Sequence, residues 1–314
     1  MEKPWLKFYP PGVPPEVDIP LKSVNDLFDE ATEKWKNRTA LIFYGKKYSY
    51  GALREKVYQF AAALHKLGIR KGDRVALLLL NSPEHFIAFY GIIRIGAIVT
   101  PVSPVYVASE VKHQLLDSGA EHIICQDMLY DVVEKTGVKL KNVIITNIGE
   151  SLPKLKRLFG KSILRAVYQK RALKSVEVIR GEGVWQFQEL INQYPPDPPK
   201  VEIDPKKDLL TLPYTGGTTG SPKGVMITNH CVVANAMQFK TLFSFLEEGK
   251  DCLLGYMPFY HAAGQFNFLL SGIFQGSTIV ILTTPEIDDI LHAIMRYKVT
   301  LFNGAPAVYE ALKD

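Results

Sequence analysis

The stretch YTGGTTGSPKG, residues 214–224, concentrates glycines, hydroxyls and one lysine. Its glycines permit backbone conformations closed to other residues and let a ligand approach the main chain. Its threonine and serine hydroxyls add hydrogen-bond donors, and its lysine adds a positive charge. Backbone amides, hydroxyls and an ammonium together suit a polyanion, above all a phosphate chain. We therefore expect a phosphate-binding loop made of Thr215, Gly216, Gly217, Thr218, Thr219, Gly220, Ser221, Pro222, Lys223 and Gly224.

This loop differs from the Walker A loop, in which G-x-x-x-x-G-K-[ST] leads directly into a helix. Here Lys223 follows a proline and precedes a glycine, and the next residues, GVMIT (224–228), have strand character. A helix is expected to begin only around Thr228 or Asn229. The loop is therefore predicted to lie between strands, without a helix dipole at the phosphate. The alternative is a solvated Gly/Ser/Thr hairpin tip that binds nothing.

Alternating strands and helices are expected to position this loop. In the first half of the chain, apolar runs predict strands at 73–80, 97–101 and 121–125, with helices at 81–96 and 109–119 between them. In the second half, the same reasoning predicts strands at 252–257, 277–282 and 299–304 and helices at 264–275 and 287–298. A β-α-β-α-β order implies a parallel, doubly wound sheet.

A proline-rich connector, YPPDPPKVEIDP (194–205), separates the two halves, because proline suits neither a helix interior nor a central strand. The predicted fold class is therefore α/β, with two doubly wound β-α-β subdomains. Residues 1–200 would form the first subdomain, with an N-terminal arm and a basic insertion at 151–175. Residues 201–314 would form the second α/β unit, which carries the phosphate loop.

The charge of the chain is concentrated in that insertion. The net charge is +5, but residues 151–175 hold eight basic and no acidic residues, so the remainder carries −3. Nothing else indicates a nucleic-acid surface. Read as a helix, the insertion is basic and amphipathic, which is typical of peripheral contact with an anionic membrane. The alternative is a solvated surface helix whose apolar stripe packs on the sheet.

Composition predicts a cytoplasmic protein whose membrane contact, if any, is peripheral and made through residues 151–175. Apolar runs such as VALLLL (75–80) are too short to span a bilayer, and the N-terminus lacks the apolar core of a secretory signal. The three cysteines, Cys125, Cys231 and Cys252, have no disulfide or metal spacing, which favours reduced, buried thiols.

Several segments closely resemble the adenylate-forming superfamily, which includes acyl-CoA synthetases, aryl-CoA ligases and luciferases. LPYTGGTTGSPKGVMITNH (212–230) resembles its signature loop, and residues 48–106 look like its first two core motifs in order. YMPFYHAAGQFNFLLSGIFQGSTIVIL (256–282) looks like the fourth motif, with His261 in the place of the family histidine. The segment 299–312 resembles the family segment after that motif. The resemblance runs from about Tyr48 onward and is weakest over residues 127–200.

The resemblance implies a function. Family members join a carboxylate to ATP, releasing pyrophosphate, and then transfer the acyl group to a thiol, commonly coenzyme A. By this resemblance Lys223 and the loop amides would hold the β- and γ-phosphates, Thr218 would lie near Mg²⁺, and His261 would stand near the α-phosphate at the mouth of the acyl pocket. The implied cofactors and partners are ATP, Mg²⁺, CoA and a fatty acid, since the YTGGTTG variant is similar to that of fatty acyl-CoA synthetases.

The sequence leaves several alternatives open. The ligase could act on an aryl or another non-fatty carboxylate, or the chain could be a truncated, non-catalytic protein that binds acyl groups or nucleotides. His261 could be a core or turn histidine with a satisfied hydrogen bond. The aromatic residues Phe259, Tyr260, Phe266 and Phe268 could line an acyl site or belong to the core.

The chain departs from the family pattern by ending at Asp314. The family's adenine-binding segment, its magnesium-binding glutamate, its ribose aspartate and its C-terminal domain with the adenylation lysine do not occur in this sequence. We therefore expect an incomplete large N-terminal domain of the acyl-CoA synthetase type that does not turn over alone. Apolar surface left uncovered around residues 299–312 predicts a homodimer or poor solubility.

Overall fold

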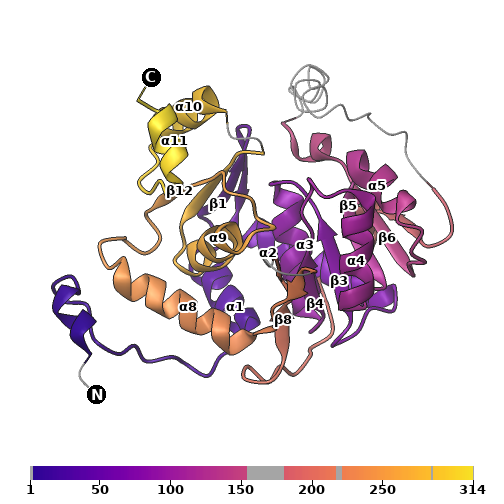
Figure 1. Cartoon of the computed structure of the whole chain (residues 1–314), viewed down its shortest axis with the longest axis horizontal. Coiled ribbons are helices and arrows are strands. Elements are labelled where there is room, and N and C mark those ends of the chain that lie inside the picture. The colour runs from indigo at the N-terminus through magenta and orange to yellow at the C-terminus, as the bar shows by residue number, and fades with distance from the viewer. Residues whose placement is uncertain (1–2, 154–179, 217–220, 284–285, 314) are drawn as a thin grey trace.

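The computed structural model describes residues 3–153, 180–216, 221–283 and 286–313 (Figure 1). Strands and helices alternate over most of this length, as the sequence predicts. The described strands form two larger sheets that lie side by side and a separate two-stranded hairpin. Over the described residues, no helix combines the length and the apolar character needed to cross a membrane. Only residues 151–153 of the basic insertion are described, so the predicted amphipathic helix lies outside the described residues.

Seven described strands form the larger sheet, in the order β11 (Ile227–Thr228), β8 (Leu209–Thr211), β4 (Ile98–Pro101), β3 (Arg74–Leu78), β5 (His122–Gln126), β6 (Asn142–Thr146) and β7 (Val184–Gln186). All neighbours in this sheet are parallel except β11 and β8. From β3 the chain passes through α3 (Pro83–Arg94) to β4 on one side, and from β4 it returns through α4 (Ala108–Ser118) to β5 on the other side of β3. The doubly wound, parallel α/β prediction is confirmed.

The smaller sheet has the order β12 (Cys252–Gly255), β13 (Thr278–Ile281), β1 (Thr39–Phe43) and β2 (Lys46–Ser49). Strands β1 and β2 form a hairpin whose two-residue turn, Tyr44–Gly45, has positive φ at both positions, as such turns require. Strand β1 then pairs in parallel with β13, which lies far along the sequence. Each sheet therefore takes strands from both sides of residue 200, and the division there into subdomains stays a prediction.

One predicted strand is wrong. Of residues 299–304 only Leu301 forms a bridge, to Leu253. The amide of Cys252 donates to the side-chain oxygen of Thr300 at 3.0 Å. The Thr300 hydroxyl thus accepts the hydrogen bond that a backbone carbonyl would accept if residues 299–304 paired with β12 as a strand.

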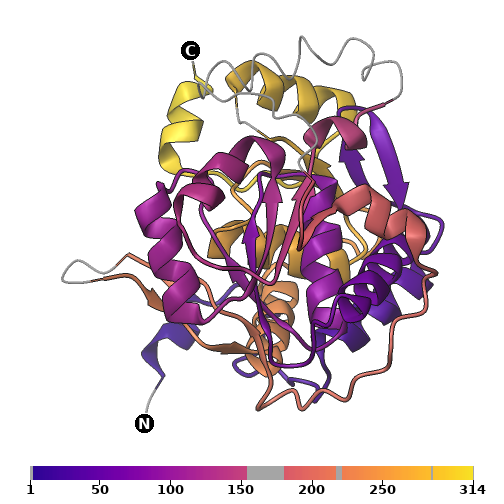
Figure 2. The same cartoon turned by 90° about the vertical axis from the view of Figure 1, so that its right-hand side faces the viewer.

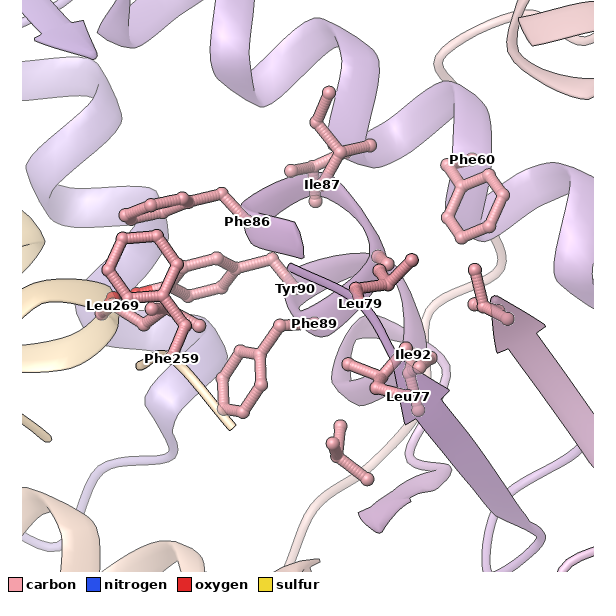
Figure 3. Packing of buried hydrophobic residues seen from close by; sticks show 14 of the residues in the cluster. Phe60, Leu77, Leu79, Phe86, Ile87, Phe89, Tyr90, Ile92, Phe259 and Leu269 are labelled. Atoms are coloured by element: carbon pink, nitrogen blue, oxygen red, sulfur yellow. The ribbon is translucent and has the colours of Figure 1, made fainter. Parts of the chain in front are cut away.

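Helix α3 is the centre of the molecule, because every residue from Pro83 to Ile93 is buried. A helix that is apolar on all sides must be covered on all sides. Figure 3 shows Phe86 and Tyr90 of this helix beside Phe259 and Leu269, which come from the segment after β12. The rings of Phe86 and Phe259 meet edge to face with centroids 5.2 Å apart. Helix α3 therefore joins the two sheets through one apolar core.

The remaining elements surround this core. They are η1 (Pro4–Phe8), α1 (Val24–Lys34), α2 (Tyr50–Lys66), η2 (Asp127–Leu129), α5 (Tyr130–Lys135), η3 (Ile148–Ser151), α7 (Phe187–Gln193), β9 (Tyr214–Thr215), β10 (Lys223–Gly224), α8 (Asn229–Leu242), α9 (Ala262–Gly264), η4 (Gln265–Gly272), α10 (Ile287–Tyr297) and α11 (Pro306–Ala311). The connector 194–205 runs as coil around the edge of the molecule (Figure 2).

The helix predicted at 264–275 is present, but much of it is a π-helix, η4. A π-helix has i→i−5 instead of i→i−4 hydrogen bonds. Each of its carbonyl oxygens also has a second lone pair that can accept from a side chain. The hydroxyl of Tyr90, on α3, donates to the carbonyl oxygen of Leu269 within η4. This contact explains how a buried tyrosine is satisfied inside the apolar core.

Candidate functional site

Strands β9 and β10 form a short antiparallel hairpin that carries the predicted phosphate loop. Lys223 lies directly opposite Thr215, and Gly224 lies opposite Tyr214. Opposed residues of an antiparallel pair point to the same face, and successive residues point to opposite faces. The lysine ammonium and the Thr215 hydroxyl therefore share one face of the hairpin. The prediction that this loop lies between strands is confirmed.

The other face of the hairpin is occupied by Tyr214. Its hydroxyl donates to Oδ2 of Asp117, on α4, at 2.6 Å, and its ring covers Gly224. A Cβ on Gly224 would lie 3.1 Å from that ring, which is tighter than ordinary packing. Burial, and then the neighbouring Asp117 carboxylate, raise the pKa of Tyr214. Close packing therefore gives Gly224 a reason to be glycine that is independent of any phosphate.

The segments before and after the hairpin fix it to the larger sheet. Leu212, just after β8, donates its amide to the carbonyl of Val99 on β4, and its own carbonyl accepts from the Thr100 hydroxyl at 3.3 Å. After the hairpin, Thr228 caps α8 by accepting from the amide of Cys231. Helix α8 thus begins at Asn229, as the sequence predicts, and its N-terminus does not form part of the loop.

The described residues of the loop are open to ligand. Thr215, Gly216, Ser221 and Lys223 are exposed. Apart from its neighbours along the chain, no atom of the described residues lies within 4 Å of the position a Cβ would take on Gly216. Hydroxyl donors, an exposed ammonium and unobstructed backbone are the groups that a phosphate chain needs. Residues 217–220, which include Thr218, lie outside the described residues.

His261 lies in a different part of the site, at the start of α9. It is exposed, and its Nδ1 accepts from the amide of Ala263 at 3.3 Å. In the neutral ring Nδ1 is then the acceptor, and the proton lies on Nε2. No hydrogen bond or ion pair within the described part of the chain joins His261 to the β9–β10 hairpin. The common role of Lys223 and His261 stays a prediction.

The backbone that leads to His261 is held by Asn81, which follows β3. The Asn81 amide donates to the carbonyl of Met257 at 2.9 Å and to those of Tyr256 and Leu282 at 3.3 Å each. Its side-chain oxygen accepts from the amide of Phe259 at 2.8 Å. One side chain therefore joins the carboxyl ends of β3, β12 and β13, where ligands bind in α/β folds.

Close packing between the turn and α9 adds a second constraint. A Cβ on Gly264 would lie 2.1 Å from the carbonyl oxygen of Pro258, so no other residue fits there. The amide of His261 donates to the same carbonyl at 3.1 Å. Sequence reasoning found His261 and missed the role of Asn81, although a polar residue at the end of an apolar run such as 75–80 marks the carboxyl end of a strand, where ligands bind.

Two of the four aromatic residues considered for the acyl site belong to the core. Phe259 and Phe268 are buried, and Phe259 packs against Phe86 and His85 of α3 (Figure 3). Tyr260 and Phe266 are half-buried. Gln265 is buried, and neither of its side-chain polar atoms has a hydrogen-bond partner among the described residues. Such a group normally has a partner, which makes it a residue of interest beside His261.

Comparison with known proteins agrees with these features. The family model described as AMP-binding enzyme matches residues 28–314. The chain belongs to this family. It is 32% identical over 314 residues to the long-chain-fatty-acid–CoA ligase of Bacillus subtilis, and 33% identical over 320 residues to that of Escherichia coli O157:H7. These alignments cover 99% of the chain.

Among solved structures, the AMP-binding chain superposes on a long-chain-fatty-acid–CoA ligase from Archaeoglobus fulgidus with a TM-score of 0.77 and 27% identity. That superposition covers 97% of this chain and 55% of the other. The chain likewise spans 55–56% of the length of the two curated ligases, about half of each. The α/β fold of the N-terminal part of such ligases is therefore shown for this chain.

Proposed function

We propose that this chain is part of a ligase that activates a fatty acid with ATP, giving an acyl-adenylate, and then transfers the acyl group to coenzyme A. The observation that carries the proposal is the cross-strand pair of Lys223 and Thr215 on the open face of the β9–β10 hairpin. The names of the similar proteins support the fatty acid and CoA parts of the proposal.

The proposed chemistry requires positioning and charge neutralisation more than an acid or a base, since the carboxylate itself attacks the α-phosphate. Lys223 would neutralise the phosphate oxygens on which charge accumulates as pyrophosphate leaves. The Thr215 and Ser221 hydroxyls and the open backbone at Gly216 would complete the contacts to those oxygens. Donors held around the phosphates in this way would favour the transition state, because charge develops there on the oxygens that they contact.

The residues of this chain fit the phosphates of ATP, and they offer few side-chain ligands for Mg²⁺. Within the described segments no group of three or more His, Cys, Asp or Glu side chains could hold a metal. Mg²⁺ binds through phosphate oxygens and water with few protein ligands, so this chain would supply the phosphate contacts and a hydroxyl such as Thr218. When bound, Mg²⁺ would neutralise charge on the phosphates.

His261 would lie at the entrance to the acyl pocket, held there by Asn81. Its exposed ring, with the proton on Nε2, could donate to a phosphate or carboxylate oxygen. Two alternatives are weighed against this proposal: a ligase for an aryl or other non-fatty acid, and a non-catalytic protein that binds acyl groups or nucleotides. Cytoplasmic location, peripheral membrane contact through residues 151–175 and a homodimer likewise remain proposals.

The test measures phosphate binding by this chain. Magnesium pyrophosphate is titrated into the protein and followed by NMR, with Lys223→Ala beside the wild type. Loss of a charge-assisted hydrogen bond is expected to weaken binding about tenfold to a hundredfold. Lys47→Ala is the matched control, because Lys47 is also an exposed strand lysine but lies on the other sheet. Equal affinities in Lys223→Ala and the wild type would refute the phosphate role.

A panel of carboxylates then separates the substrate alternatives. ATP–pyrophosphate exchange is measured on the full-length ligase that contains these residues, with fatty, aryl and amino acids. Exchange with fatty acids supports the proposal, and exchange with aryl acids alone supports the first alternative. Absence of exchange with every acid, despite pyrophosphate binding, supports the non-catalytic alternative.

A further inference from the structure

Helix α4 contacts the hairpin at two points that the phosphate-binding proposal does not use. Nε2 of His113 lies 3.1 Å from the carbonyl oxygen of Pro222, the residue directly before Lys223. One helical turn further on, Oδ2 of Asp117 accepts from Tyr214 at 2.6 Å. Residues four apart lie on the same face of a helix. One face of α4 therefore holds the hairpin at Tyr214, next to Thr215 in β9, and at Pro222, just before β10. Figure 2 shows the backbone of the hairpin beside this helix.

Helix α4 is itself fixed to the larger sheet, so it can serve as a rigid support. The buried side chain of Gln114 donates to the hydroxyl of Thr100 at 3.0 Å and to the carbonyl of Pro101 at 2.8 Å, both on β4. The Thr100 hydroxyl in turn donates to the carbonyl of Leu212. The helix and the start of the hairpin are thus tied to the same strand.

A short hairpin needs such support. The β9–β10 pair has two residues in each strand, and an isolated two-stranded hairpin is at best marginally stable in water. Its lysine side must stay open to ligand, so only the opposite side and the backbone can be held. The contacts from α4 use these: the Tyr214 side chain on the opposite face and a backbone carbonyl at Pro222.

We propose that His113 and Asp117 are positioning residues that hold the hairpin so that Lys223 and Thr215 face the phosphates. This inference rests on the proposed phosphate role of Lys223 and adds the residues that orient it. His113 and Asp117 act through the hairpin and do not touch the phosphate. A pocket of about 200 Å³ that is open to the surface lies where α4 meets the hairpin, and its lining includes Tyr106, His113, Tyr214 and Pro222.

The experiment uses three kinds of variant of the whole chain. His113→Leu and Tyr214→Phe each remove one contact. His113→Gln is the conservative variant, because the Gln side-chain nitrogen lies as many bonds from Cα as Nε2 of histidine and can donate to the Pro222 carbonyl. Lys112→Leu is the matched control, since Lys112 is the exposed neighbour on the same helix.

The first measurement is NMR-detected amide hydrogen exchange at Thr215, Lys223 and Val225. Loss of one hydrogen bond is expected to speed exchange at these amides about two- to tenfold in His113→Leu and Tyr214→Phe. His113→Gln should restore the wild-type rate, and Lys112→Leu should not change it. Exchange of core amides such as that of Ile92 should stay the same in all variants, which separates a local effect from general destabilisation.

The second measurement is the affinity for magnesium pyrophosphate, expected to fall about two- to tenfold in His113→Leu and Tyr214→Phe and to recover in His113→Gln. Unchanged hairpin exchange in both variants overturns the proposal, as does an equal change in Lys112→Leu. Faster exchange with unchanged affinity also overturns it, because the contacts are then structural only. If the wild type binds no pyrophosphate, the phosphate role of Lys223 fails, and the exchange rates alone still decide whether α4 holds the hairpin.

Discussion

Removal of the Asn81 side chain should have the largest effect among polar substitutions outside the loop. Asn81 is 4% exposed, and its side-chain amide contacts four backbone groups in the second half of the chain, three within residues 256–259 and one at Leu282. Its two N–H donors are shared among three carbonyls, and its oxygen accepts one amide. Asn81→Ala leaves all of these buried backbone groups without that partner.

The magnitude depends on the number of hydrogen bonds lost. Two donors and one acceptor amount to about three bonds, and each contributes roughly 0.5–1.5 kcal/mol net, so the expected loss is about 2–4 kcal/mol. Such a loss is a large fraction of the roughly 5–15 kcal/mol that stabilises a typical domain. The turn that carries His261 should loosen first, because the Phe259 amide and the Met257 carbonyl are its attachments.

The assay is urea unfolding, with the free energy of unfolding taken from linear extrapolation and the m-value checked for constancy. Asn192→Ala is the control, since Asn192 is exposed on α7 and its loss should change stability by less than about 0.5 kcal/mol. A loss below about 0.5 kcal/mol in Asn81→Ala would refute the reasoning that this side chain joins the two sheets.

A second substitution at the same position tests whether the side-chain nitrogen of Asn81 is needed as a hydrogen-bond donor. Asn81→Asp keeps the oxygen that accepts from Phe259 but turns a carboxyl towards three carbonyls. Burial and these carbonyls should raise the folded-state pKa of the new carboxyl above its unfolded value of about 3.9. Stability relative to the wild type should then be highest below about pH 4 and fall as the pH rises. A pH-independent difference would contradict this account.

Single contacts elsewhere in the core give three further predictions. Burial lowers the pKa of His85 to about 4, so the unfolded chain binds the extra proton and stability falls as the pH drops from about 6.5 towards 4. In His85→Leu up to about 3 kcal/mol of this acid-dependent decrease in the free energy of unfolding should disappear. An unchanged pH dependence of the free energy of unfolding, measured with urea, would contradict this prediction. Gly264→Ala should destabilise the fold by about 1–3 kcal/mol because its Cβ meets the Pro258 carbonyl, whereas Gly181→Ala, with only an ordinary contact, should cost less than about 1 kcal/mol in the same assay. Tyr90→Phe leaves the Leu269 carbonyl in η4 without its donor and should cost about 1–3 kcal/mol in thermal or urea unfolding; no measurable change would show that another group satisfies it.

The sequence by itself determined the features that depend on neighbouring residues. The density of glycines and hydroxyls around Lys223 indicated a phosphate loop, and the strand character of residues 224–228 placed it between strands. The start of α8 at Asn229 and the end of α4 before Gly119 depend on capping rules that act within one turn. Alternation of apolar strands and helices was enough for the parallel α/β class.

Only the tertiary structure decided which distant segments meet. Strand β1 pairs with β13, β8 joins a sheet built mostly from the first half, and the residues at 299–304 form a single bridge instead of a strand. These outcomes depend on competition among many possible partners for backbone hydrogen bonds, which no local pattern records. The same holds for Asn81, His113 and Asp117, whose partners lie about 100 or more residues away. Nothing in the neighbouring sequence identifies the partners of these side chains. The fold brings the buried Asn81 amide between the two larger sheets, and it brings the face of α4 that carries His113 and Asp117 against the β9–β10 hairpin.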